Sequence, residues 1–220
     1  MIEIVNSGGV TSALGFSAGG THAGLKSEIG SLDLGLLISD RNSNVAATFT
    51  TNKIESPSVS VSRERLKRGT ARGVVANSGC ANCSVGNQGY KDAEEMTILG
   101  AAQTGVLPEE LFVASTGVIG VELPMALIRQ NIGNIKIDLE GGTDFAKSIM
   151  TTDSKHKERA VSFVHEKKVV TVGAAAKGVG MIHPNMATML CFITTDAAVE
   201  PEFLQKSLSK AVDASFNMID

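Results

Sequence analysis

The stretch KGVGMIHPNMATML, residues 177–190, is the most unusual part of the 220-residue sequence. It sets Lys177 and a His-Pro-Asn turn ahead of Thr188, and the apolar run 186–196 predicts a strand. A rigid, proline-containing turn that leads into a strand can hold one peptide bond in a strained, exposed geometry. The residues alone are also compatible with a plain loop between two buried strands, in which Lys177 is solvated and Thr188 is an ordinary strand threonine.

Outward from this stretch, short β-rich runs broken by Asn, Ser, Gly and Pro alternate with segments of helical spacing. Strands are expected at 33–40, 44–52, 58–64, 72–79, 111–116, 159–166, 167–178 and 186–196. Helices are expected at 89–104, 123–132, 142–150 and 201–218. The runs 159–166 and 167–178 predict a hairpin. The mixture predicts α/β or α+β layers, with helices covering sheets.

The composition is that of an ordinary globular protein, long enough to bury a sizeable core. Hydrophobic residues make up 43% of the chain, charged residues 20%, and the net charge is −3. This slightly acidic balance argues against binding to nucleic acid or to an anionic membrane. The sequence shows neither a signal peptide nor an apolar run of about 20 residues, so we expect a cytoplasmic protein. The 23 glycines indicate tight turns and close backbone approaches.

The run LFVASTGVIG, residues 111–120, is a second candidate for chemistry. A strand that ends in Ser-Thr-Gly can point a hydroxyl and a bare backbone N–H at one spot, as an oxyanion-binding pair requires. Such strand-to-turn junctions are also common without any functional role, so the run by itself leaves both interpretations open.

Cys80 and Cys83 form a CxxC pair, which can bind a metal or act as a redox couple. A structural zinc needs four ligands, and only Cys191 and four dispersed histidines could complete the set. We therefore expect Cys80 and Cys83 to be small, partly buried side chains, and we expect no metal. The sequence contains no phosphate-binding GxxxxGK[ST] loop, so nucleotide binding is not expected.

Several of these stretches resemble one known family. Residues 177–190 closely resemble the self-cleavage motif of the ornithine acetyltransferase family, the bifunctional glutamate N-acetyltransferases of arginine biosynthesis. Six further stretches resemble the family in the same order along the chain: GVTSALGFSAGGTHAGLK (9–26), LDLGLLISD (32–40), FTTNKIESPSV (49–59), VVANSGCAN (74–82), STGVIG (115–120) and MTTD (150–153). Family members are roughly double this length, so we expect the sequence to stop within a longer protein.

The chain departs from the family pattern at two places. Cys80 stands where the family usually has Asn, and Cys83 stands where it usually has Ala. The stretch SKHKERA, residues 154–160, lacks the family's usual Pro-Lys.

The resemblance implies self-cleavage between Ala187 and Thr188. The cut divides the present residues into an α-chain region, 1–187, and the start of a β-chain region, 188–220. The Thr188 hydroxyl attacks the preceding carbonyl, and hydrolysis of the resulting ester frees an α-amine. Because such an amine has an unperturbed pKa of about 7.7–8.0, it can act as a base at neutral pH. The resemblance further implies that Thr188 then carries an acetyl group from N-acetylornithine to glutamate in a ping-pong reaction.

By the same resemblance, Thr116 and Gly117 form the oxyanion hole, while Thr152, Lys177 and Thr188 contact the substrate. The implied fold is an αββα sandwich of the self-processing N-terminal-threonine acetyltransferase type. The implied assembly is a heterotetramer of two α and two β chains, so the chain's own C-terminal β-chain is an expected partner. No metal or organic cofactor is expected, although some members also use acetyl-CoA as acetyl donor.

Two alternatives stay open. The family shares its fold with β-peptidyl aminopeptidases, so a hydrolase with an N-terminal nucleophile, which passes the acyl group to water, is one of them. The other is a truncated or unprocessed chain that folds and binds but does not turn over.

Overall fold

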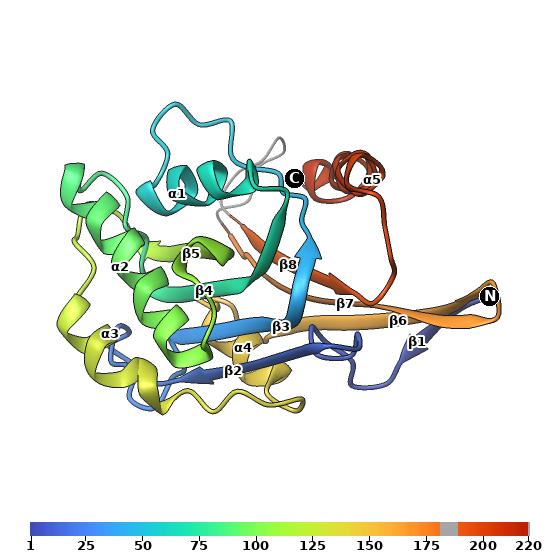
Figure 1. The fold of residues 1–220 in the computed structure, drawn as a ribbon. Helices are drawn as coiled ribbons and strands as arrows, with labels where there is room; N and C mark the ends of the chain where they lie inside the picture. Colours follow the sequence, from blue (N-terminus) through green and yellow to red (C-terminus); the bar gives the residue numbers. More distant parts are fainter. Residues whose placement is uncertain (181–188, 220) are drawn as a thin grey trace.

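Two four-stranded sheets form the framework of the part that the structure describes (Figure 1). The computed structural model describes residues 1–180 and 189–219. The first sheet has the order β2 (Phe16–Thr21), β3 (Leu34–Asn44), β4 (Thr70–Cys80), β5 (Leu111–Val118). The second sheet has the order β1 (Ile2–Val5), β6 (Lys157–His165), β7 (Lys168–Lys177), β8 (Leu190–Thr195). β4 and β5 run parallel, whereas the other paired strands run antiparallel.

Helices cover the outer face of the first sheet (Figure 1). The described part contains the helices α1 (Pro57–Leu66), α2 (Gly86–Thr104), α3 (Met125–Asn131), α4 (Gly142–Ser148) and α5 (Pro201–Asp213), with short 3-10 turns at Pro108–Glu110, Ile132–Asn134 and Phe216–Met218. Of these, α1, α2 and α3 form the layer on this outer face. Leu36 and Val75 of the first sheet pack with Met96 of α2 and Ile128 of α3 in one buried cluster. Burial of these apolar surfaces holds the helical layer on the sheet.

A second core lies between the two sheets. Phe145 of α4 meets Phe192 of β8 edge to face, with ring centroids 5.2 Å apart, a geometry that adds about 0.5–1.5 kcal/mol beyond area burial. α4 approaches the first sheet closely because Gly35 has no side chain. A Cβ on Gly35 would lie 2.2 Å from the Ser148 hydroxyl. The expected mixed α/β architecture of two stacked sheets with helices is therefore confirmed, as are the close approaches suggested by the glycines.

The expected hairpin is present as β6 and β7. The turn residues Glu166 and Lys167 have φ of 47° and 65°, the left-handed pair that a tight hairpin turn needs. The long helix expected at 89–104 is α2, which ends on Gly105 at a φ of 70°. The helices expected at 123–132, 142–150 and 201–218 are also present, with shorter bounds.

The strand expected at 58–64 is wrong, because these residues form α1. Ser56 caps the helix by accepting a hydrogen bond from the Ser58 N–H, and Pro57 occupies the first turn. The alternating Val and Ser suggested a strand, but Ser58 and Ser62 stand one helical turn apart and both face β5. The Ser62 hydroxyl donates to Val113 O at 2.7 Å and accepts from Val113 N at 2.9 Å. The Ser62 side chain of α1 thus provides hydrogen bonds for the backbone N–H and C=O of Val113, at the edge of the first sheet.

The strand expected at 44–52 is also wrong. β3 ends at Asn44, and the residues after it lie beside α5 instead of pairing with another strand. The backbone of Ala47 exchanges hydrogen bonds with the Gln205 side chain, so no ladder forms there. β1 and β2 were not expected, and residues 186–188 of the last expected strand lie outside the described residues.

The outer face of the second sheet carries apolar side chains. Ile2 and Ile4 pair with Phe163 and Val161, and these two isoleucines are 71% and 64% exposed. Within residues 1–180 and 189–219, no helix packs extensively on this face, and α5 stands apart from the other helices (Figure 1). The second helical layer of the expected αββα sandwich is therefore not formed by the described part. None of its helices is long and apolar enough to cross a membrane.

Candidate active site

Thr116 and Gly117 lie at the carboxyl end of β5, where parallel pairing sets them opposite Ser78 and Gly79. Thr116 lies two residues after Ala114, so both side chains face the space between the sheets. Thr116 is 7% exposed, and no described residue forms a hydrogen bond with its hydroxyl. This O–H is therefore available to a ligand between the sheets.

Gly117 is required by its packing. It adopts a φ of 135°, and a Cβ there would lie 2.3 Å from the carbonyl carbon of Gly79. Only glycine combines this backbone conformation with such a close approach. The Ser-Thr-Gly run noted in the sequence thus lies in the last residues of β5, where Gly117 lets the backbone approach Gly79.

Replacing Gly117 with Ala is expected to destabilise the full-length protein more than replacing Gly120 does. Both residues have a positive φ, which costs about 1–3 kcal/mol for a residue with a side chain. At Gly120 nothing lies within 4 Å of the added Cβ, whereas at Gly117 it would meet backbone. Denaturant titration of the two variants measures the difference in the free energy of unfolding. Equal losses would show that the end of β5 relaxes around the added methyl group.

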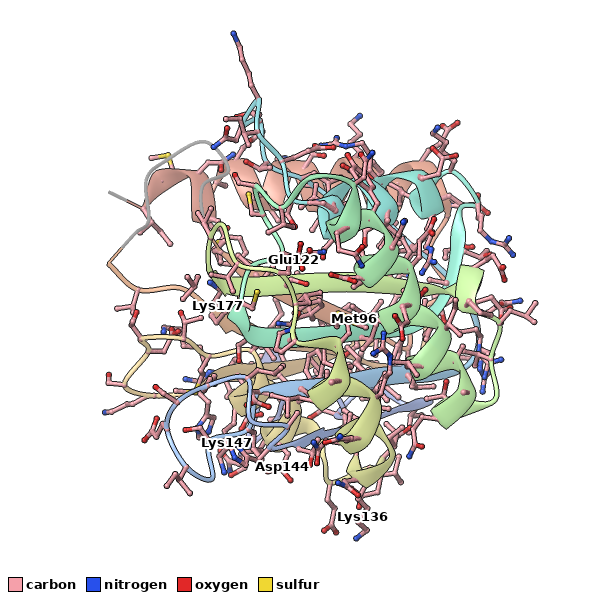
Figure 2. All side chains as sticks on the ribbon, turned by 90° about the vertical axis from the view of Figure 1, so that its left-hand side faces the viewer. Met96, Glu122, Lys136, Asp144, Lys147 and Lys177 are labelled. Atoms are coloured by element: carbon pink, nitrogen blue, oxygen red, sulfur yellow. The ribbon has the colours of Figure 1, made fainter. Side chains whose placement is uncertain are left out.

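Lys177 ends β7 on the side of Ala175, and so also faces the space between the sheets. It is 4% exposed, and Figure 2 labels it together with Glu122, which follows β5. Burial lowers the pKa of Lys177, and the Asp153 carboxylate opposes this change. No described residue accepts a hydrogen bond from its ammonium. Because a buried, unpaired ammonium is costly, this group is suited to an anionic ligand.

Asp153 connects Thr152 to Lys177. Its carboxylate accepts hydrogen bonds from the backbone N–H of Gly178 at 3.0 Å and of Thr151 at 3.3 Å, and it pairs with Lys157. Burial alone would raise the pKa of Asp153, but the Lys157 ammonium and the two N–H groups hold it below its usual value. The exposed Thr152 is therefore fixed beside the end of β7.

The structure adds Lys26, Asp33 and Asp153, to which the sequence interpretation gave no role. Lys26 donates to Leu32 O at 2.8 Å, and burial lowers its pKa, while Asp33, Glu28 and Asp153 oppose that shift. Lys26 belongs to the segment that packs on Gly79, which adjoins Gly117. All three residues lie in stretches that resemble the family, 9–26, 32–40 and 150–153, but no motif spacing in the sequence marks them as functional.

The cysteines are free. Cys80 is buried and donates its S–H to Val121 O at 3.0 Å, and Cys83 is partly exposed. Burial raises the pKa of Cys80, and it raises that of Cys191 to about 11. Among the residues that the structure describes, no three His, Cys, Asp or Glu side chains gather as a metal-binding group.

Two expected site residues, Ala187 and Thr188, lie outside the described residues. The strand that follows them begins at Leu190, which pairs with Lys177 across β7 and β8. Asp153, which follows Thr152, accepts the N–H of Gly178, which follows Lys177, and Thr116 and Gly117 lie on the facing sheet.

Residues 17–220 match the model of the ArgJ family. The arginine biosynthesis bifunctional protein ArgJ of Dehalococcoides mccartyi (strain CBDB1) is 46% identical over 219 residues, which are 99% of this chain and 54% of that protein. The ArgJ of Bacillus subtilis (strain 168) is 45% identical over 213 residues, 96% of this chain and 52% of its own length. The chain thus spans about half the length of these curated relatives.

Solved structures give the same relationship. A crystal structure of the arginine biosynthesis bifunctional protein ArgJ from Bacillus halodurans has a TM-score of 0.81 and 38% identity, over 85% of this chain and 98% of that one. The ornithine acetyltransferase of Mycobacterium tuberculosis, solved in complex with ornithine, has a TM-score of 0.78 and 34% identity, over 85% of this chain and all of that one. An aminopeptidase from Ochrobactrum anthropi with a variant of the Ntn hydrolase fold shares the fold alone, at a TM-score of 0.52 and 12% identity.

Proposed function

The chain belongs to the ArgJ family, and on that basis we propose that the whole protein is a self-cleaving acetyltransferase of arginine biosynthesis. It moves an acetyl group from N-acetylornithine to glutamate through an acetyl ester on Thr188. The observation that carries the proposal is the buried ammonium of Lys177, which has no hydrogen-bond partner among the described residues and whose strand partner Leu190 stands two residues after Thr188. This arrangement sets a cation for a substrate carboxylate beside the strand that follows the nucleophile.

Self-cleavage comes first. The Thr188 hydroxyl attacks the Ala187 carbonyl, the C–N bond breaks, and water hydrolyses the ester that forms. The lengths of the solved relatives support this step. The matched part is 85% of this chain, about 187 residues, and it spans 98% and 100% of the two solved chains. Each solved chain is therefore about as long as the part of this chain that precedes Thr188. A chain of about 187 residues has the length that cleavage before Thr188 would yield.

Acetyl transfer then uses the new N-terminus. The α-amine of Thr188 accepts the hydroxyl proton as the oxygen attacks the acetyl carbonyl of N-acetylornithine. The C–N bond breaks and the ornithine amine leaves with a proton. The amine of glutamate then attacks the acetyl ester on Thr188. N-acetylglutamate leaves, and the Thr188 hydroxyl is restored. Lys177 pairs with the carboxylate that both acetylated amino acids carry, and Thr152 supplies a further substrate contact.

The oxyanion that develops in each step is stabilised by the Thr116 hydroxyl and the Gly117 N–H. The Thr116 hydroxyl is buried and has no partner within residues 1–180 and 189–219, which supports this role, since a donor in a water-excluded site stabilises charge strongly. No cofactor takes part. We further propose that the second half of the protein supplies the remaining substrate contacts, and that two such cleaved chains assemble with their partners in the cytoplasm. We also propose that acetyl-CoA serves as a second acetyl donor.

Thr116→Ala is expected to slow the chemistry more than it weakens binding. Removal of one oxyanion donor typically lowers kcat by roughly 100- to 1000-fold. KM for N-acetylornithine should stay within a few-fold, because the hydroxyl acts on charge that develops only in the transition state. Steady-state kinetics of the full-length enzyme measure both quantities. A large rise in KM at unchanged kcat would instead assign Thr116 to substrate binding.

Hydrolysis is the competing reaction, because a fold shared with an aminopeptidase allows water as the acceptor. Ornithine release with and without glutamate separates the two functions. Release that depends on glutamate and yields equal N-acetylglutamate supports transfer. Release at the same rate with water alone would make the protein an amidohydrolase.

A further inference from the structure

Asp33 is a fully buried carboxylate that joins three segments. It is 0% exposed and stands directly before β3. One oxygen accepts the Ala23 N–H at 2.6 Å, and the other accepts those of Leu25 at 2.7 Å and Lys26 at 3.1 Å. Three charge-assisted bonds on one carboxylate fix the backbone of residues 22–26, which we call the 22–26 loop.

The backbone of Asp33 adds a second connection. Its N–H donates to Thr21 O at 3.0 Å, and its carbonyl accepts from Ser78 N at 2.8 Å. Ser78 is the residue of β4 that lies opposite Thr116. Asp33 is therefore bonded both to the 22–26 loop and to the strand that adjoins the candidate oxyanion hole.

The 22–26 loop reaches Gly117 through a single layer of backbone. A Cβ on Gly79 would lie 2.5 Å from Leu25 O and 3.3 Å from Lys26 N. On the other side, a Cβ on Gly117 would lie 2.3 Å from the carbonyl carbon of Gly79. Leu25, Gly79 and Gly117 are thus stacked backbone on backbone, with no side chain between them. Close-packed groups transmit a displacement of the loop directly to Gly117.

We infer that Asp33 is a positioning residue for the oxyanion hole: its carboxylate fixes the 22–26 loop, which supports Gly79 and so sets the place of the Gly117 N–H. The inference rests on the proposed function, because it assigns Gly117 a catalytic N–H. A carboxylate is suited to this task since its two oxygens accept all three N–H groups, whereas a neutral amide offers one oxygen only.

The test is Asp33→Asn in the full-length protein. Asn keeps the size of the side chain but turns an NH₂ group toward one set of N–H donors, so the loop shifts. We expect kcat for acetyl transfer to fall roughly 10- to 100-fold, the cost of a small misplacement of catalytic groups, while KM for N-acetylornithine stays within a few-fold. Asp33→Glu, which restores both acceptor oxygens and the charge, should recover part of kcat and serves as the test if the Asn variant does not fold.

Asp196→Asn is the matched control. Asp196 also accepts backbone N–H bonds from two segments, Thr171 at 2.8 Å and Leu14 at 3.1 Å. Thr171 lies six residues along β7 from Lys177, about 20 Å away. This variant should lose stability without the kcat loss. It separates general weakening of the fold from displacement of Gly117.

A double-mutant cycle with Thr116→Ala completes the test. If Asp33 acts through the oxyanion hole, the two losses in kcat are less than additive, because each variant impairs the same pair of donors. Additive losses, a change in KM alone, or equal kcat losses in the Asp196 control would overturn the inference. A wild-type enzyme with exchange activity but an unaffected Asp33→Asn variant would overturn it as well and leave the proposed function standing. Absence of exchange in the wild type would overturn the proposed function and the inference with it.

Discussion

Thr188→Ala is expected to leave the full-length protein as one uncut chain with no acetyl-transfer activity. The change removes the hydroxyl that attacks the Ala187 carbonyl and that later carries the acetyl group. Without cleavage no α-amine forms, so the base is lost together with the nucleophile. Gel electrophoresis measures cleavage, and ornithine release from N-acetylornithine measures transfer.

Thr188→Ser is the matched control for this loss. Serine keeps the hydroxyl and, after cleavage, the α-amine, so it should still give two fragments and measurable transfer. An alanine variant that nevertheless splits after residue 187 would refute the role of Thr188 in cleavage. An alanine variant that transfers acetyl groups would refute its role as the acetyl carrier.

The 220-residue chain on its own is expected to lack exchange activity even where it folds. It spans about half the length of its curated relatives, and the outer face of its second sheet carries the exposed Ile2, Ile4 and Ile193. Phe203 of α5 is also 67% exposed. Such an apolar face needs cover, so the isolated chain should associate or bind a hydrophobic dye.

Co-expression with the second half of a full-length relative is expected to restore activity and to abolish dye binding. The second half would cover the apolar face and supply the missing substrate contacts. Size-exclusion chromatography and exchange assays on the chain alone and on the co-expressed pair make the comparison. A well-behaved monomer of 220 residues with full exchange activity would contradict this expectation.

The sequence predicts those elements whose pattern is long and local. The sequence 89–104 has apolar positions near helical spacing, and β6 and β7 are adjacent β-rich runs, so both α2 and the hairpin were expected correctly. α1 was not, because Val-Ser alternation fits a strand equally well over a few residues. What decides its structure is the contact of Ser62 with Val113, fifty-one residues away in the sequence.

The N-terminal strands were missed for a related reason. β1 is four residues long, and β2 is the glycine-rich FSAGGT, which carries little β propensity. Each becomes a strand only through its partner, β6 for one and β3 for the other. Their existence depends on pairing that no local window contains.

The candidate site shows the same division. The Ser-Thr-Gly junction and the unusual stretch from Lys177 marked Thr116, Gly117 and Lys177, and the structure places all three at strand ends that face the space between the sheets. Asp33 and Asp153 were not singled out, because each acts on backbone N–H groups of a segment that folding brings to it. A carboxylate that accepts backbone N–H groups can have almost any residue type as its partner, so the sequence does not reveal the contact.

Mass spectrometry of the full-length protein, before and after exposure to N-acetylornithine without glutamate, tests whether Thr188 both marks the cleavage site and carries the acetyl group. Before exposure, we expect two chains, the second of which begins at Thr188. After exposure, that second chain should carry one acetyl group on its N-terminal peptide, and addition of glutamate should remove it. An intact single chain with exchange activity, or an acetyl group found on any residue other than Thr188, would contradict the roles proposed for Thr188.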